Sequence, residues 1–210
     1  MRTSLPDVSS SSSKPSRGEA REALVAAGRR LFAEQGYRAT TTRQIATEAH
    51  VSHALLRYHF SSKEGLRQAV DENVLGAFGT AFGAAREEGI ETGTLAEAGR
   101  AAALVFGADS ERRRYIRRVL IDGDDRGAAL LQQLVDGAEN EIERLMAGGS
   151  VLPAEDRRWA AYQVLFLILG PLLLEPTLTQ VLGTDPFEPT TLSERSEANQ
   201  RLLQRGLFDP

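Results

Sequence analysis

The chain has 210 residues, enough for one moderate domain or for a small domain joined to a larger one, and its hydrophobic content of 41% is ordinary for a globular protein. It contains no cysteine, which excludes disulfides and thiolate metal sites. Its net charge is −4, but the charge is unevenly distributed. Residues 14–68 hold ten Lys/Arg and five Asp/Glu, whereas the residues that follow are acidic on balance. A basic segment joined to an acidic one favours a head that binds a polyanion.

The N-terminal residues 1–13 are expected to form a disordered tail, because their Ser, Pro and Asp residues cannot bury enough surface to offset the entropy of ordering. This tail lacks the apolar segment of a secretory signal. The longest apolar run, residues 164–174, is interrupted by Gly170 and Pro171 and is too short to span a bilayer. We therefore expect a cytoplasmic protein with no membrane partner.

The first helix is predicted over Arg17–Gln35, where Leu24, Leu31 and Phe32 recur at helical spacing. Gly36 then ends the helix as a glycine just beyond its C-terminus.

Two short helices follow with a sharp turn between them. The first begins at Thr41 or Thr42, and the second is predicted over His53–Phe60 with Ser52 as its N-cap. His50 lies where the chain must turn. Three short helices with such a turn are the geometry of a helix-turn-helix head.

The remainder is predicted to be helical as well, which makes the fold all-α. Ser61 and Glu64 form a capping box that opens a long helix to about residue 88. The domains are then the tail, a three-helix head over residues 14–68, and a larger helical domain over residues 69–210. The later helices are expected at 94–107, 110–121, 126–147, 153–175 and 191–205.

The segment TTRQIATEAHVSHALLRYHFSSKEGL, residues 41–66, closely resembles the N-terminal domain of TetR/AcrR-family regulators. The upstream phrase ALVAAGRRLFAEQGYRATTT is similar to the first helix and turn of that family. His50 stands at the family's turn glycine, a position that implies a left-handed backbone. Arg57 stands at a common tyrosine of the recognition helix. The matching positions are Thr41, Thr42, Ile45, Ala46, Ala49, Val51, Ser52, His59, Phe60, Ser62, Lys63, Glu64 and Leu66.

The resemblance implies a homodimer whose recognition helices read an operator in double-stranded DNA. Helix N-termini would hold phosphates near Thr42 and Lys63, although plain capping and a solvated lysine are the alternative. Arg57 is open to either a phosphate or a guanine contact, and Leu55 and His59 are open to a core role. The candidate DNA-binding residues are Thr41, Thr42, Arg43, Ser52, His53, Ala54, Leu55, Arg57, Tyr58, His59 and Lys63.

The resemblance also implies a C-terminal domain that holds a small-molecule effector and the dimer contacts. Aromatic residues at helical spacing are candidates for the ligand pocket, with an ordinary core role as the alternative. They are Phe78, Phe82, Phe106, Tyr115, Tyr162 and Phe166. The candidate dimer residues, which could instead be buried within one subunit, are Trp159, Leu167, Leu174, Leu192, Leu202 and Leu203.

Together these observations predict a ligand-responsive, dimeric transcriptional regulator, by family habit a repressor, that binds a pseudo-palindromic operator. An enzyme is disfavoured, because the sequence has no nucleophile–base pair, phosphate-binding glycine loop or metal spacing. Two alternatives remain open: a small-molecule-binding protein with a non-functional head, and a regulator that acts through protein partners.

Overall fold

The computed structural model of the protein describes residues 16–87, 95–107, 109–147 and 157–205. The expected tail at residues 1–13 lies outside these residues. Across the described ranges the regular structure is entirely helical, which confirms the all-α prediction. The helices are α1 (Arg17–Gln35), α2 (Thr42–Glu48), α3 (His53–Phe60), α4 (Lys63–Glu87), α5 (Leu95–Gly107), α6 (Ser110–Asp122), α7 (Asp125–Ala147), α8 (Arg157–Leu173), α9 (Glu175–Leu182) and α10 (Pro189–Leu203).

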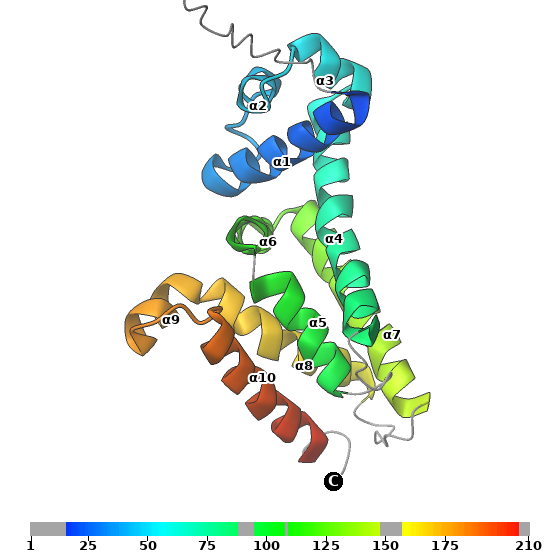
Figure 1. Cartoon of the computed structure of the whole chain (residues 1–210), viewed down its shortest axis with the longest axis vertical. Helices are drawn as coiled ribbons and strands as arrows, with labels where there is room; N and C mark the ends of the chain where they lie inside the picture. Colours follow the sequence, from blue (N-terminus) through cyan, green and yellow to red (C-terminus); the bar gives the residue numbers. More distant parts are fainter. Residues whose placement is uncertain (1–15, 88–94, 108, 148–156, 206–210) are drawn as a thin grey trace, which may run out of the picture.

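The helices form a small head and a larger body (Figure 1). The head consists of α1, α2 and α3, and the body contains α5 to α10. The long helix α4 belongs to both, because its first half packs on α1 and its second half packs on α5. Apolar side chains along α4, including Leu66, Val70 and Val74, are fully buried and join the two cores.

Side-chain caps fix where the head's helices begin. The hydroxyls of Ser16, Thr41 and Ser52 each accept a hydrogen bond from a backbone N–H in the first turn that follows. The predicted capping box at Ser61 is wrong by one residue. Ser61 ends α3, and the hydroxyl of Ser62 accepts the N–H of Gly65 at 3.0 Å to open α4.

The predicted helix over 153–175 corresponds to α8, although residues 153–156 lie outside the described ranges, and an additional helix that the sequence did not predict follows it. α8 ends at Leu173, and α9 leaves its axis at 73°. Pro176 stands in the first turn of α9, where the missing proline N–H leaves no intrahelical hydrogen bond unmade. A proline there favours a new helix start over continuation of the old one, which the apolar periodicity alone did not indicate.

Ion pairs join the head to the body across the α1–α6 contact. The guanidinium of Arg29 lies 3.1 Å from Asp109 and 3.6 Å from Glu111, and that of Arg30 lies 3.2 Å from Glu111. Arg30 also contacts Glu48 at 2.5 Å, which extends the network to α2. The start of α6 is thereby held directly against the head.

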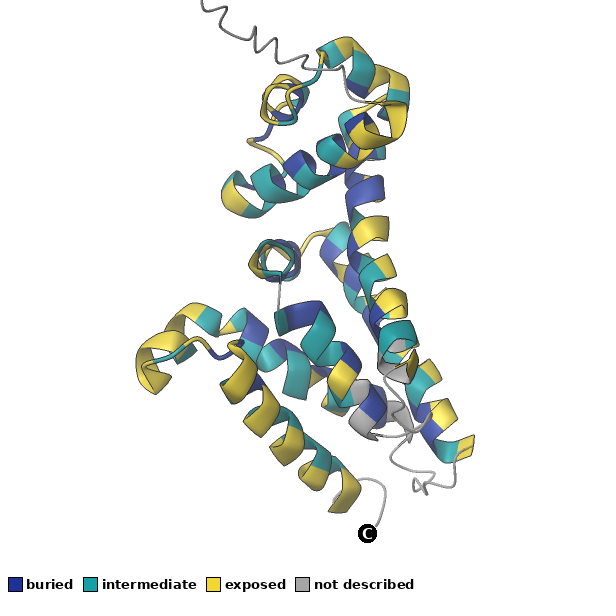
Figure 2. Cartoon of the chain, in the orientation of Figure 1, coloured by how far each residue is buried: buried dark blue, intermediate teal, exposed yellow. Residues whose placement is uncertain are grey.

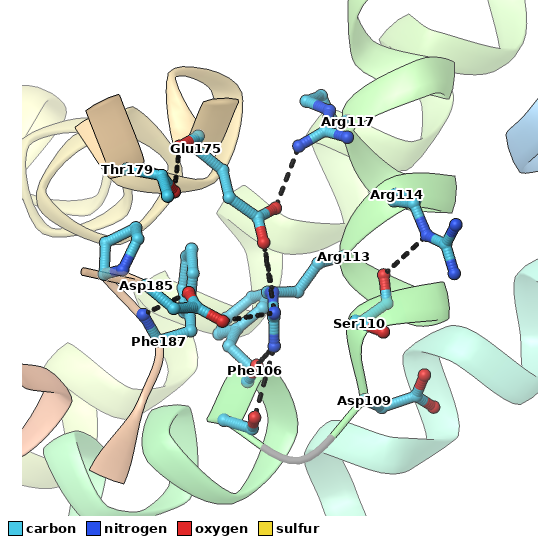
Figure 3. A network of polar contacts seen from close by, with 12 residues as sticks. Phe106, Asp109, Ser110, Arg113, Arg114, Arg117, Glu175, Thr179, Asp185 and Phe187 are labelled. Atoms are coloured by element: carbon cyan, nitrogen blue, oxygen red, sulfur yellow. Dashed lines mark hydrogen bonds and ion pairs between the residues drawn. The ribbon is translucent and has the colours of Figure 1, made fainter. Parts of the chain in front are cut away.

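A buried arginine holds the C-terminal part of the body together (Figure 3). Arg113 of α6 is 3% exposed, and its guanidinium lies 3.0 Å from Glu175 at the start of α9 and 3.6 Å from Asp185 in the following loop. The same group donates to the carbonyls of Phe106 and Gly107 at the end of α5 and stacks on the ring of Phe187. One side chain therefore connects four segments.

None of the described helices is by itself long and apolar enough to cross a membrane. Among the described helices, α8 and α9 taken together reach the length and composition of a span, across a bend of 73°.

We expect Arg113→Met to lower the free energy of unfolding by about 3 kcal/mol, because the α5 carbonyls and Asp185 lose their partner and Glu175 keeps only Arg117. The control Arg114→Met removes an exposed arginine from the same helix and should change stability by no more than about 0.5 kcal/mol. Urea denaturation at one fixed protein concentration measures both. Equal stability of the two variants would contradict a central role for Arg113.

Candidate nucleic-acid interface and ligand cavity

The turn between α2 and α3 has the backbone that the sequence predicted. His50 has a φ of 54°, in the left-handed region that most non-glycine residues avoid. The N–H of Val51 donates to the carbonyl of Ala46 at 3.0 Å, which closes the turn. This geometry sets α3 across α2 and turns one face of α3 outward.

The outward face of α3 carries Ala54, Arg57 and Tyr58, and all three are exposed. Tyr58 is 65% exposed, which is unusual for a large aromatic side chain. The opposite face is the packing face, with Leu56 fully buried and Phe60 nearly so. The helix thus presents a polar and aromatic surface on a rigid support.

Leu55 and His59 lie between these two faces and are half-buried. The ring of His59 lies beside the rings of Tyr58 and Phe60, with centroid distances of 5.2 and 6.0 Å. His59 therefore packs along the edge of the small core.

Two side chains near helix starts have partners within the head. The hydroxyl of Thr42 lies 3.0 Å from Nε2 of His53, a contact that links α2 to α3. The ammonium of Lys63 lies over the ring of Tyr37 at 4.1 Å, and the hydroxyl of Tyr37 donates to Glu64 at 2.8 Å. Burial lowers the pKa of Lys63, and the nearby charge of Arg67 adds to this effect. Thr41, Arg43 and Ser52 are exposed.

The body contains a cavity of about 540 Å³ between α4, α5, α7, α8 and α10. This volume lies within the usual range for small-molecule sites. Most of its wall is apolar, and α10 contributes Arg195, Ser196, Asn199 and Gln200 on one side. α10 packs so closely on α5 that a side chain at Gly99 would collide with Ser196 and Gln200.

The candidate pocket aromatics are not all at this cavity. Phe78 and Phe106 line it, with their ring centroids 5.6 Å apart. Tyr115 is buried outside the cavity lining. Its hydroxyl donates to Asp71 on α4 at 2.6 Å. Tyr162 and Phe166 lie outside the lining, on the α8 face that also carries Trp159. Phe82 is on α4, and its side chain is not among those that the structure describes.

The candidate dimer residues separate into two groups. Trp159, Leu174 and Leu202 are each more than half exposed. Leu167 and Leu203 line the cavity, and Leu192 is buried inside the subunit, where it packs near Gly107. α9 and one side of α10 are largely exposed in Figure 2.

Two family models match the chain. One, described as "Bacterial regulatory proteins, tetR family", matches residues 24–70, which contain the turn and α3. The other, described as "Tetracyclin repressor-like, C-terminal domain", matches residues 110–203. The chain belongs to the TetR family of bacterial transcriptional regulators.

Individual relatives agree with this TetR-family assignment. The chain is 32% identical over 116 residues to the HTH-type transcriptional regulatory protein RaaS of Mycobacterium tuberculosis, and the alignment spans 55% of this chain and 52% of the relative, about half of each. A putative fatty acid metabolism regulator of Clostridium perfringens shares the fold, with 18% identity, a TM-score of 0.67, and coverage of 89% of this chain and 98% of that one. So does a putative transcriptional regulator of Saccharomonospora viridis, solved with choline, with 17% identity, a TM-score of 0.62, and coverage of 92% and 100%.

Sequence reasoning missed two residues that the structure makes important for this TetR-family chain. Gly65 lies in the first turn of α4, where a Cβ atom would overlap the carbonyl oxygen of Phe60. Arg195 lines the cavity at one end of α10. A sequence signal for Gly65 did exist, because it lies inside a predicted helix. Glycine lowers the stability of a helix interior, so its presence there indicates that close packing requires it. No local pattern distinguishes Arg195 from other arginines.

We expect Gly65→Ala to lower the free energy of unfolding by about 2 kcal/mol or more, because the methyl group displaces the backbone that connects α3 to α4. Gly76→Ala is the matched control on the same helix, with no heavy atom within 4 Å of its Cβ position. It should stabilise by about 0.5 to 1 kcal/mol. Thermal unfolding followed by circular dichroism separates them, and similar melting temperatures would refute the close contact.

Proposed function

We propose that this TetR-family chain is a ligand-responsive regulator that binds a pseudo-palindromic DNA operator as a homodimer. The observation that carries the proposal is the exposed surface of α3, where Ala54, Arg57 and Tyr58 stand on a packed helix-turn-helix. An Arg can pair with a guanine edge or a phosphate, and small or aromatic side chains can contact thymine methyl groups. A dimer would set two such helices in successive major grooves, about 34 Å apart.

Residues around α3 complete the proposed DNA surface. Thr41, Thr42 and Ser52 stand at the starts of α2 and α3, where backbone N–H groups and the helix dipole favour a phosphate. Arg43 is exposed in the first turn of α2, and Lys63 is near the start of α4. His53, Leu55 and His59 would lie beside the DNA contacts that the exposed face of α3 makes.

The direct test is fluorescence anisotropy of the purified protein with its own upstream intergenic DNA, at two salt concentrations and with excess competitor DNA. Tight binding that resists competitor and weakens steeply with salt is expected, because phosphate contacts release counterions. Weak binding that competitor abolishes would contradict sequence-specific recognition of that DNA and favour action through protein partners.

We expect Arg57→Ala to weaken operator binding about tenfold or more while the protein still dimerises, because a base or phosphate contact is lost without change to the packed face of α3. Arg114→Ala, an exposed arginine on α6, is the control and should bind as the wild type does. Anisotropy gives the affinities, and analytical ultracentrifugation gives the oligomeric state. Wild-type affinity in Arg57→Ala would remove Arg57 from the proposed site.

The proposed dimer interface uses the exposed apolar side chains of α8, α10 and the α8–α9 junction. Trp159, Leu174 and Leu202 expose more than half of their area, and Phe166 of α8 is 58% exposed. Large exposed apolar side chains that lie near one another mark a protein interface more often than an ordinary surface.

We expect Leu202→Glu to shift the protein from dimer to monomer, because a charge placed in an apolar interface loses its hydration without gaining a partner. Ile121→Glu is the control, since Ile121 is similarly exposed but lies on α6. Sedimentation velocity over a range of protein concentrations measures both. A dimer that persists in Leu202→Glu and dissociates in Ile121→Glu would place the interface elsewhere.

Regulation is proposed to start at the cavity in the body. α4 lines this cavity with Leu75 and Phe78 and also carries Leu66 into the core of the head. A ligand that changes the position of α4 would therefore move the head, and the coupling to DNA affinity would act equally in both directions.

A further inference from the structure

The cavity has an arginine at one end that the protein itself does not neutralise. Arg195 of α10 lies over the ring of Phe187 at 4.7 Å, and one of its N–H groups donates to the carbonyl of Pro186 at 3.0 Å. In the described part of the chain no carboxylate oxygen lies within 4.0 Å of its guanidinium nitrogens. The nearby Asp185 is paired with Arg113 instead.

The surroundings of Arg195 make its positive charge unfavourable. Burial lowers the pKa of Arg195, and the positive charge of Arg113 lowers it further, against the opposite effect of Asp185. A guanidinium has five N–H donors, and the contacts above use one of them. A desolvated cation with spare donors is stabilised by an anion that accepts two of those hydrogen bonds.

The other charged side chains among the described residues of the cavity lining are paired with one another. Arg144 and Glu141 of α7 form an ion pair at 2.6 Å, so their charges compensate one another. Gln200 donates to the hydroxyl of Ser196 at 3.2 Å. Among the described lining residues, the charge without an ion-pair partner is therefore that of Arg195.

The remainder of the cavity suits a long apolar group. Its wall follows α10 from Leu192 to Leu203, a distance of about 16 Å at 1.5 Å per residue. Apolar side chains of four other helices face the same space, among them Phe78, Phe106, Leu134 and Ile168. Burial of an alkyl chain there would contribute about 0.8 kcal/mol for each methylene.

We propose that this cavity binds an apolar carboxylate, whose headgroup pairs with Arg195 and whose hydrocarbon body lies along α10. This inference rests on the proposed function, because it names the chemical class of the effector. It assigns to Arg195 a role in ligand selection that is separate from its hydrogen bond to Pro186.

The test compares decanoate with 1-decanol, which has the same chain length and no charge, by isothermal titration calorimetry on the purified full chain without DNA. We expect decanoate to bind and Arg195→Gln to weaken it about tenfold or more, because an ionic hydrogen-bonded pair is lost. Decanol should bind wild type and variant within about twofold, since its apolar contacts are unchanged. Arg201→Gln removes an exposed arginine of α10 outside the lining and should leave decanoate binding unchanged.

A purely structural role for Arg195 predicts a different pattern. Arg195→Gln would then lower the melting temperature and weaken decanoate and decanol equally, and either that result or the absence of decanoate binding to the wild type would overturn the proposal. Loss of decanoate binding in Arg144→Gln but not in Arg195→Gln would also overturn it. Arg195→Lys should recover part of the decanoate affinity, because it restores the charge in a variant that keeps the fold.

DNA binding is measured separately, so that the two proposals can fail independently. If decanoate binds through Arg195 and leaves operator affinity unchanged, the ligand class is supported and ligand-responsive regulation is contradicted. If operator binding is absent while Arg195-dependent decanoate binding persists, the cavity assignment again holds and the DNA-binding proposal fails.

Discussion

The C-terminal half of this protein depends on the buried guanidinium of Arg113. It connects α6 with the end of α5, the start of α9 and the loop before α10. Because a buried cation is unfavourable without acceptors, these segments can occupy only positions that bring their oxygens to it. The start of α10 is fixed in this way, and with it one wall of the cavity and the exposed apolar face that we assign to the dimer.

The same constraint explains why two neighbouring arginines have different roles. Arg113 and Arg195 both stack on Phe187, but Arg113 takes both nearby carboxylates. Arg195 donates to one carbonyl and is among the residues that line the cavity. The positions of the two carboxylates thus give the two arginines different roles. Arg113 forms structural ion pairs, and Arg195 is the candidate cation for ligand binding.

The path from cavity to head is short and made of packed elements. α4 lines the cavity and enters the core of the head, and the start of α6 is tied to α1 through Arg29, Arg30 and their two acidic partners. A ligand that shifts α4 would therefore act on the head through packed side chains, and the ion pairs between α6 and α1 add a second connection. The head would then move as a unit, without a change in its internal packing.

The sequence by itself determined the local structure and the family of this protein. The all-α fold, the helix start at Thr41 or Thr42, the cap at Ser52 and the left-handed turn at His50 were predicted because each depends on residues only a few positions apart. Only the tertiary structure decided the bend at α9, the burial of Leu192, the close contact at Gly65 and the lining of the cavity. These features depend on contacts such as that of Arg113 with Glu175, 62 residues later, which no local pattern in a single sequence reveals.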